Sequence, residues 1–259
     1  MLARAIVTEE TDPAANLSLE EAIFLENRGV TLRFWSNEES VIIGRAQLAK
    51  YETDLAFCKE NGIAVVRRFT AGGAVYNGRG NINWSIFLAR EAEARGLGYV
   101  KDPSEIFRRF SRPLLVALRE LGVDAELEPP NRIVTPEGKV SGMAAYVSKD
   151  GLLCHGTLLL DADLERVRRV TSPSREQLER RYTRSRDTRT VNTGLEVGSL
   201  VRTFIRVFEE EAGLELAEAR PSEAEGETAG RLLSKYTDPT WNLGDPFEAR
   251  PGGSGSLGR

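Results

Sequence analysis

The stretch from Arg67 to Phe87, RRFTAGGAVYNGRGNINWSIF, constrains the fold more than any other part of this chain. An apolar run at 63–66 leads into it and has the composition of a buried strand. Two further short strands are expected at 74–76 and 82–87, with glycine-bearing turns before each. Glycines let a backbone approach a ligand closely, and free N–H groups with nearby guanidinium groups suit phosphate or carboxylate. Two interpretations stay open: an anion-binding loop, or a hairpin with its arginines facing water.

Composition and charge narrow the class of protein. Hydrophobic residues make up 41% and charged residues 29% of the 259 residues, which is typical of a soluble globular enzyme with one large domain or two small ones. No apolar run approaches the ~20 residues of a membrane span, and the start, MLARAIVTEE, lacks a signal-peptide pattern. The net charge of -4 argues against broad nucleic-acid binding. Cys58 and Cys154 have no metal-ligand spacing, so we expect a reducing cytoplasm.

Strands and helices alternate along the chain. Capping residues, among them Asp12 and the Ser222/Glu225 pair, and apolar periodicity predict helices. The expected ranges are 13–27, 52–60, 103–121, 161–170, 174–182, 197–212 and 222–236. Period-two and apolar runs outside the opening stretch predict strands at 3–8, 31–35, 41–43, 131–134, 139–144 and 152–160. This pattern predicts an α/β (α+β) fold, with flanking helices on a mostly antiparallel mixed sheet. One domain is expected over 1–243, and residues 244–259, which end in PGGSGSLGR, are expected to form a flexible tail.

The strands predicted at 139–144 and 152–160 form a hairpin, and Lys139 and His155 are its candidate functional residues. Lys139 follows a Pro-Glu-Gly turn, where most lysines are solvated charges. His155 is the only histidine, and spacing supplies it with neither an acidic partner nor a serine nucleophile, so a structural role is the commoner outcome. The nine arginines from Arg166 to Arg189 form either a solvated helical face or a docking surface for an acidic protein.

The motif RRFTAGGAVYNGRGNINWS resembles the signature of the lipoate–protein ligase A family, in which a double arginine and a glycine triplet precede Ala-Val-Tyr and Gly-Asn-x-Asn-Trp/Phe-Ser/Thr. The similarity runs from the amino terminus to about Leu243. Three shorter motifs follow the family's order: Gly44-Arg45-Ala46-Gln47, Gly138-Lys139-Val140-Ser141-Gly142 and His155-Gly156-Thr157. The resemblance implies the biotin/lipoate ligase catalytic fold, related to the sheet of class II synthetases.

The resemblance also implies a reaction. Lipoate and ATP, which arrives with Mg²⁺, form lipoyl-AMP and pyrophosphate, and the lipoyl group passes to a lysine of a lipoyl carrier domain. Such carriers are the glycine cleavage H protein and the acyltransferase subunit of 2-oxoacid dehydrogenases. Lys139 matches the family's lysine that contacts the acyl carboxylate and the adenylate phosphate, so it is the expected catalytic residue. An ammonium ~4 Å from the developing charge is worth ~4 kcal/mol before desolvation.

The other site residues are carried over from the family's motifs. Those expected to bind substrate and adenylate are Arg67, Arg68, Ala71, Gly72, Gly73, Tyr76, Asn77, Asn83, Asn131, His155, Gly156 and Thr157. Gly44 and Gln47 are expected beside the acyl pocket. The chain departs from the family's pattern at Ala71, at Asn77-Gly78 and at Arg132, which replace a glycine, His-Asp and an aspartate. Because that aspartate lies near the metal in the family, no metal ligand is assigned.

Three alternatives remain beside the ligase. A cysteine-dependent octanoyl or lipoyl transferase shares the fold and the lysine, but 131–138 holds no cysteine and Cys154 lies within a predicted strand. A biotin ligase would need a Gly-Arg-Gly-Arg-x-Gly-Arg loop, which is missing. A non-catalytic lipoyl-binding relative would have no reason to keep Lys139.

The layout also resembles archaeal relatives that work with a separately encoded small protein. Longer relatives continue into a small domain after Leu243, whereas sixteen residues follow it here. Those residues hold too few apolar side chains to build a core. We therefore expect a separate small accessory subunit, and weak adenylation without it.

Overall fold

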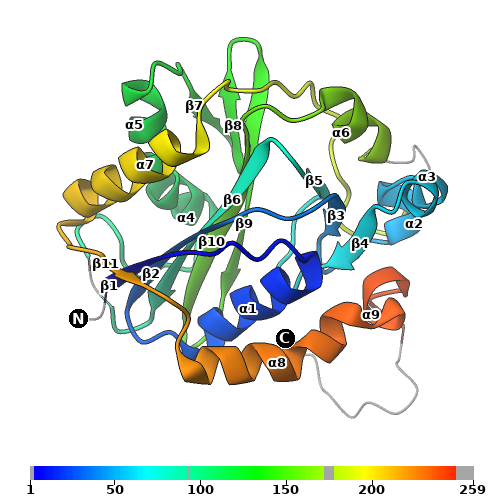
Figure 1. The fold of residues 1–259 in the computed structure, drawn as a ribbon, viewed down its shortest axis with the longest axis horizontal. Helices are drawn as coiled ribbons and strands as arrows, with labels where there is room; N and C mark the ends of the chain where they lie inside the picture. The colour runs from blue at the N-terminus through cyan, green and yellow to red at the C-terminus, as the bar shows by residue number, and fades with distance from the viewer. Residues whose placement is uncertain (1–2, 93, 172–177, 249–259) are drawn as a thin grey trace.

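Two sheets of unequal size organise the computed structural model, which describes residues 3–92, 94–171 and 178–248 (Figure 1). The larger one, called the main sheet, contains in order β11 (Ala217–Ala219), β1 (Ala3–Val7), β2 (Val30–Trp35), β6 (Asn81–Ala89), β10 (Gly151–Leu159), β9 (Gly138–Val147), β8 (Arg132–Thr135) and β7 (Glu126–Glu128). The smaller contains β4 (Ala64–Arg67), β3 (Ser40–Ile43) and β5 (Val75–Asn77). Only β11, β1 and β2 pair in parallel within the main sheet, so the expected mostly antiparallel mixed sheet is confirmed.

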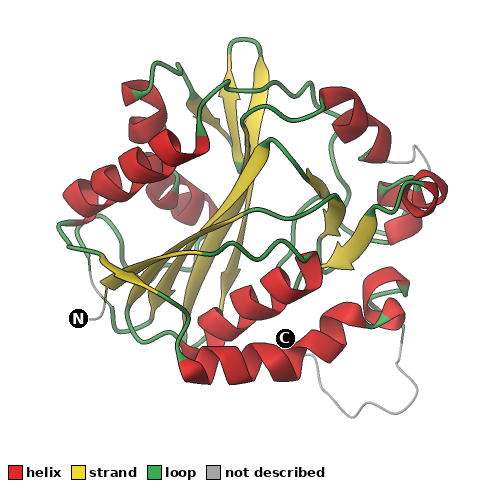
Figure 2. Cartoon of the chain, viewed as in Figure 1, coloured by secondary structure: helices red, strands yellow, loops and turns green. Residues whose placement is uncertain are grey.

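Helices lie on both faces of the main sheet and beside the smaller sheet (Figure 2). They are α1 (Pro13–Glu26), α2 (Ala49–Glu52), α3 (Leu55–Glu60), α4 (Pro103–Phe110), α5 (Arg112–Glu120), α6 (Leu164–Val170), α7 (Val197–Ala212), α8 (Glu223–Thr237) and α9 (Pro239–Leu243). The predicted caps are present: Asp12 accepts a hydrogen bond from Ala15 N, and Ser222 with Glu225 forms a capping box. In the described ranges, no helix combines the length and the apolar character that a membrane crossing needs.

Two segments that were each predicted as one continuous helix are interrupted in the structure. The helix expected at 103–121 breaks into α4 and α5 at Ser111, because Pro113 lacks an N–H and its ring crowds the preceding turn. The helix expected at 52–60 is α3 alone, capped by Asp54, while Glu52 ends the separate helix α2.

Two further predictions need correction after residue 160. The helix expected from Asp161 begins at Leu164, since Asp163 caps it by accepting from Arg166 N. Of the helix expected at 174–182, residues 174–177 lie outside the described residues, and 178–182 form a turn. The expected tail at 244–259 is described only to Glu248, and within that part Asp245 accepts a hydrogen bond from Tyr182.

The alternation of side chains along β6 and β10 separates an apolar core from a polar face. Trp84, Ile86 and Cys154 join the largest core cluster, together with residues of α4, α5 and α7. The intervening residues face the opposite side, where Ser85 pairs with His155 and Asn83 with Thr157 across the two strands. This polar face forms the floor of the site.

Candidate active site

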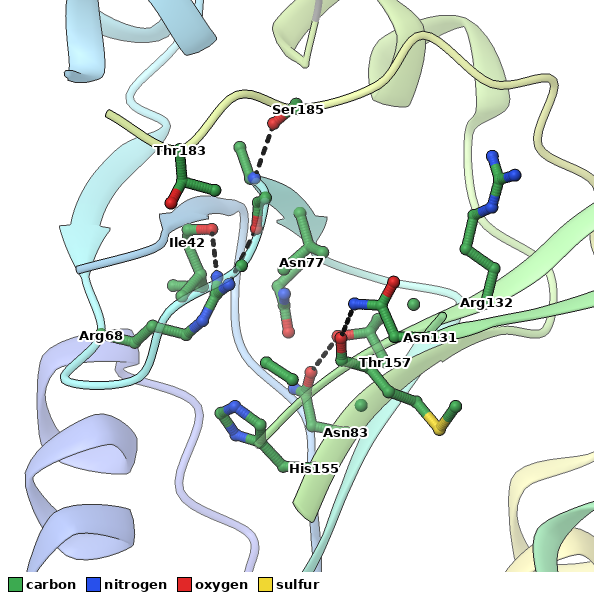
Figure 3. Close-up of a pocket in the computed structure, with 18 of the residues that line it drawn as sticks. Ile42, Arg68, Asn77, Asn83, Asn131, Arg132, His155, Thr157, Thr183 and Ser185 are labelled. Atoms are coloured by element: carbon green, nitrogen blue, oxygen red, sulfur yellow. Dashed lines mark hydrogen bonds between the residues drawn. The ribbon is translucent and has the colours of Figure 1, made fainter. Parts of the chain in front are cut away.

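A cavity of about 280 Å³ lies over the polar face of the main sheet, beneath the glycine-bearing loop that follows β4 (Figure 3). Most of the predicted site residues line it: Arg68, Gly72, Gly73, Asn77, Asn83, Asn131, Lys139, His155, Gly156 and Thr157. The structure thus brings together residues from the glycine loop, from β6 and from the β8–β10 hairpins. Arg67, Ala71, Tyr76, Gly44 and Gln47 do not line it.

The floor of the cavity is a hydrogen-bonded network that the sequence did not reveal. His155 Nδ1 lies 2.8 Å from Glu20 Oε1, and its Nε2 lies 2.9 Å from Thr70 Oγ1. Ser85 Oγ donates to the same Glu20 oxygen at 2.6 Å. Glu20 comes from α1 and is fully buried. The acidic partner of His155 therefore exists, but spacing could not show it because 135 residues separate the two.

Burial and charge oppose each other at Glu20. Burial raises the pKa of this carboxyl, but the charge and hydrogen bond of His155, the hydroxyl of Ser85 and the charge of Arg33 together outweigh it, so the net pKa is lowered. Arg33, on β2, is also fully buried and donates to Asn16 Oδ1 at 2.6 Å. Burial lowers the pKa of Arg33 to about 10, although the charge of Glu20 opposes the shift. Both groups therefore remain charged at neutral pH.

Arg68 braces the glycine loop. Its guanidinium donates to Ile42 O at 3.2 Å (Figure 3). It also donates to Gly73 O at 2.9 Å and to Ala71 O at 2.7 Å. Gly72 has a φ of 101°, which side chains rarely adopt. The alternative in which the arginines beside the loop face water is wrong for Arg68, which is 5% exposed. Arg68 lines the cavity and also holds the loop's own carbonyls.

Arg67 is not on the cavity side at all. Its side chain is 1% exposed, and its guanidinium donates to backbone carbonyls of the 44–47 turn and of α9, including Gln47 O at 2.5 Å and Trp241 O at 2.7 Å. Gly44 belongs to the same turn, where a Cβ would lie 2.0 Å from Gly72 O. These residues support the glycine loop from behind.

The other predicted residues outside the cavity have structural contacts of their own. Gln47 Oε1 accepts from Gly44 N at 2.8 Å, and Tyr76 OH donates to Glu39 at 2.9 Å. Ala71 contributes its carbonyl to Arg68. Each thus shapes the turn or the loop that borders the cavity.

Lys139 contributes a cation to the cavity wall. It is the second residue of β9 and lies over Gly142, where a Cβ would come within 2.9 Å of Nζ. Burial lowers its pKa, and the charge of Arg132 lowers it further. No carboxylate of the described residues lies within ion-pair distance of Lys139 Nζ. A desolvated ammonium beside another cation, with no protein anion to neutralise it, favours an anionic ligand.

The cavity has a second wall, missed by sequence reasoning, that we call the strap (residues 183–188). Ser185 Oγ accepts from Ala74 N at 2.8 Å in the glycine loop and from Gln47 Nε2 at 3.0 Å. Glu52, fully buried, anchors the strap by accepting from Ser185 N at 2.9 Å. The sequence offered only an arginine-rich segment here, with no periodic signal.

Neither cysteine is placed for catalysis. Cys154 is fully buried in the apolar core, where burial raises the pKa of its thiol. Cys58 is buried on α3, as expected for a small core residue. The described residues hold no group of three or more histidines, cysteines or carboxylates that could bind a metal ion. Among the described residues, Glu20 is the one carboxylate that lines the cavity. Its Oε1 already binds Ser85 and His155 and its Oε2 is buried without a hydrogen-bond partner, so the lining offers a magnesium ion no set of carboxylate ligands.

Comparison with known proteins assigns the family. Residues 12–209 match the model of the lipoyl protein ligase A/B catalytic domain, and the chain belongs to this family. It is 31% identical over 247 residues to lipoate-protein ligase A subunit 1 of Thermoplasma acidophilum, covering 88% of this chain and 91% of that one. It is 34% identical over 183 residues to lipoate-protein ligase LplJ of Bacillus subtilis, covering 70% of this chain. The chain matches about half, 53%, of that longer relative.

Solved structures agree with this assignment. A bipartite lipoate protein ligase studied with its E2 lipoyl domain from Thermoplasma acidophilum superposes with a TM-score of 0.81 at 28% identity, covering 94% of this chain and 97% of that one. A putative lipoate protein ligase from the same organism with bound lipoic acid gives 0.80 at 28% identity, over 94% and 100%. A lipoate-protein ligase A bound with ATP gives 0.81 at 28% identity, over 94% and 99%.

Proposed function

We propose that this chain activates lipoate with ATP to form lipoyl-AMP and transfers the lipoyl group to a lysine of a lipoyl carrier domain. The observation that carries the proposal is the ammonium of Lys139, which lies in a cavity walled by the glycine loop and has no ion-pair partner among the described residues. Relatives of this architecture have been solved with lipoic acid and with ATP.

The chemistry requires a cation where Lys139 lies. In the first step the lipoate carboxylate attacks the α-phosphorus of ATP, and pyrophosphate leaves with the electron pair of the broken P–O bond. Two anions approach each other and charge builds on phosphorus, so an ammonium at ~4 Å stabilises this transition state by ~4 kcal/mol before desolvation. In the second step the neutral amine of the carrier lysine attacks the acyl carbonyl, and AMP leaves.

The apolar lining of the cavity suits the acyl tail. Leu17, Trp35, Ile42 and Val75 contribute it, and each methylene buried against such a wall adds ~0.8 kcal/mol. This wall accepts lipoate and also a straight eight-carbon chain, so affinity for octanoate is expected as well. Asn77 and Asn83 each have a buried Nδ2 with no hydrogen-bond partner, which leaves donors for an oxygen-rich ligand.

The metal arrives with the nucleotide in this proposal. Mg²⁺ accompanies ATP and is held by phosphate oxygens, because the one carboxylate that lines the cavity among the described residues, Glu20, is fully buried and binds Ser85 and His155. The ion neutralises phosphate charge when bound. The protein's own part is to hold the acyl chain and to place the ammonium of Lys139.

The carrier is a lipoyl domain of the kind found in the glycine cleavage H protein or in the acyltransferase subunit of 2-oxoacid dehydrogenases, and the reaction takes place in the cytoplasm. Several arginines between 166 and 189 are neutralised within the structure, such as Arg166 by Glu39 and Arg169 by Asp54. Arg180, Arg186 and Arg189 are among the exposed arginines of this segment, so they are candidates for docking an acidic carrier.

A small accessory subunit completes the enzyme. The chain spans about half of one longer relative and most of a relative named as subunit 1. Adenylation needs a site closed to water, so we expect weak activity from the chain alone and full activity with the partner. The cysteine-dependent transferase is not supported, since Cys154 faces the apolar core.

The test is lipoate-dependent exchange of labelled pyrophosphate into ATP, measured with and without a candidate small subunit. Exchange that requires lipoate supports the ligase, whether or not the partner is needed. Transfer from preformed lipoyl-AMP to a lipoyl domain tests the second half-reaction separately. Acyl transfer without ATP, together with a thioester trapped on Cys154, would overturn the proposal.

A further inference from the structure

The segment from Trp241 to Phe247, which we call the hook, contacts both walls of the cavity from outside. Toward the first wall, Asn242 Oδ1 accepts from Arg67 N at 2.9 Å, and Trp241 Nε1 donates to Arg67 O at 2.8 Å. The Arg67 guanidinium then donates to Gly244 O at 2.8 Å on the hook and to Gln47 O on the turn at 44–47. Arg67 therefore ties the hook to the turn that packs against Gly72.

Toward the second wall, the hook binds the residue that immediately precedes the strap. Tyr182 OH donates to Asp245 Oδ2 at 2.6 Å, and the rings of Tyr182 and Phe247 pack edge-to-face with centroids 5.3 Å apart. Arg181 lies over both rings, at 5.0 Å and 5.5 Å from their centroids. Immediately after Tyr182, Thr183 and Ser185 enter the cavity lining.

We propose that the hook positions the two cavity walls relative to each other, with Arg67 and Tyr182 as its positioning residues. Neither residue touches the cavity, yet each is one step from a segment that does. The walls also meet at Ser185, which joins Ala74 N of the glycine loop to Gln47. A shift of the hook is thus transmitted to the glycine loop through the turn at 44–47 and to the strap through Tyr182.

The coupling between the hook and the glycine loop is rigid. A Cβ on Gly44 would lie 2.0 Å from Gly72 O, so the turn and the loop are in backbone contact with no side chain between them. On the strap side the hook contributes side-chain contacts, one hydroxyl and one aromatic pair. The strap itself is also held by Thr183 N, which donates to Ala46 O at 2.9 Å, and by Glu52. The strap is therefore the wall that loosens first when the hook is disturbed.

The first test is hydrogen exchange of the ligand-free full chain carrying Tyr182→Phe, which deletes the hydroxyl and keeps the ring. Loss of a hydrogen bond to a carboxylate should speed exchange at Thr183 and Ser185 amides about fivefold, while the melting temperature changes little. Tyr99→Phe is the matched control, since Tyr99 OH donates to Ser148 O at 2.6 Å away from the cavity. Unchanged strap exchange in Tyr182→Phe, or an equal increase in Tyr99→Phe, overturns the proposal.

The second test is kinetic and rests on the proposed function, whereas the exchange experiment does not. Tyr182→Phe should raise the KM for ATP about fivefold with kcat within about twofold, because the wall is misplaced while Lys139 is intact. Trp241→Phe should instead speed exchange in the glycine loop at 72–74. Equal falls in kcat for both variants without a change in KM would show that the hook only stabilises the fold.

Discussion

The two faces of the main sheet use the same strands and have opposite compositions. Toward α4, α5 and α7, β6 and β10 present Trp84, Ile86 and Cys154, all at most 1% exposed. Toward α1 they present Ser85 and His155, which are also buried but bound to Glu20. Successive residues of one strand therefore face either the apolar core, which stabilises the fold, or the floor of the cavity, where the reaction is expected to take place.

The difference shows how a polar face can be buried. Polar groups cost free energy in an apolar setting unless they are hydrogen-bonded. Here α1 supplies the partners, since Glu20 accepts from Ser85 and Asn16 accepts from Arg33. The same helix that closes the second face therefore holds the site's polar groups in place.

The largest expected effect is on the apolar face. Phe204→Ala on α7 removes a fully buried ring that packs on Phe34 and Trp84, at centroid distances of 5.3 Å and 5.8 Å. The free energy of unfolding in urea should fall by about 3–5 kcal/mol, with activity per folded molecule nearly unchanged. Val197→Ala, a 45% exposed position on the same helix, should change it by less than about 0.5 kcal/mol. Loss of adenylation in folded Phe204→Ala would show that the two faces are not separable.

On the site's side, Lys139→Ala should lower lipoyl-AMP formation by about a hundredfold or more, with little loss of stability. Lys139→Arg should also fail, because a planar fork does not replace a compact ammonium. Lys149→Ala, an exposed lysine of the same hairpin, is the control. The pKa of Lys139 is lowered from 10.5, so its ammonium loses its proton at a lower pH than an ordinary lysine does. As the pH is raised, wild-type activity should therefore begin to fall earlier than it would with an ordinary lysine. Near-normal adenylation by Lys139→Ala would contradict the catalytic role assigned to Lys139.

Glu20→Gln tests the polar network with a smaller expected effect. The folded pKa of Glu20 is below 4.5, so its carboxylate contributes stability above about pH 4.5, and this is lost as pH falls through the lower folded pKa. Near neutral pH the variant should lose about 1–3 kcal/mol, and the difference from wild type should shrink in acid. Urea unfolding at a series of pH values measures both. A difference independent of pH would contradict the charged state assigned to Glu20.

The smallest effect is expected at Cys154. Cys154→Ala should cost about 1 kcal/mol of stability, as for one buried methylene-sized group. ATP-dependent transfer should remain intact in Cys154→Ala and in Cys154→Ser. Thermal melting measures the stability, and an assay of transfer to a lipoyl domain measures the activity. Loss of transfer with intact stability would show that Cys154 takes part in the reaction.

Local signals predicted most of the fold. The caps at Asp12 and Ser222 placed α1 and α8 within about one residue, and the apolar period of α7 matched its bounds. The break at Ser111 was visible as Pro113 but was overridden by the helical period on both sides. The three-residue strands β7 and β11 carried no pattern of their own, because pairing with a neighbour defines them.

The site residues show the same difference between features with a local sequence signal and features that depend on distant contacts. Motif residues that face the cavity, such as Asn83, Lys139 and Thr157, were predicted from the family signature. Arg67 shares that motif but binds carbonyls about 175 residues away, and Glu20 meets His155 across 135 residues. Contacts of that range have no local sequence pattern, so the fold alone reveals them.

The far edge of the main sheet has a consequence for how the molecule is made. β1 lies between β2 and β11, and Arg4 binds Glu225 of α8 across 221 residues of sequence. A nascent chain emerging from the ribosome therefore holds β1 with one edge unpaired until nearly all of the catalytic domain has been synthesised. An unpaired strand edge is a template for association with other chains, and such high contact order slows folding. Shielding the edge of β1 during synthesis should therefore raise the yield of folded protein.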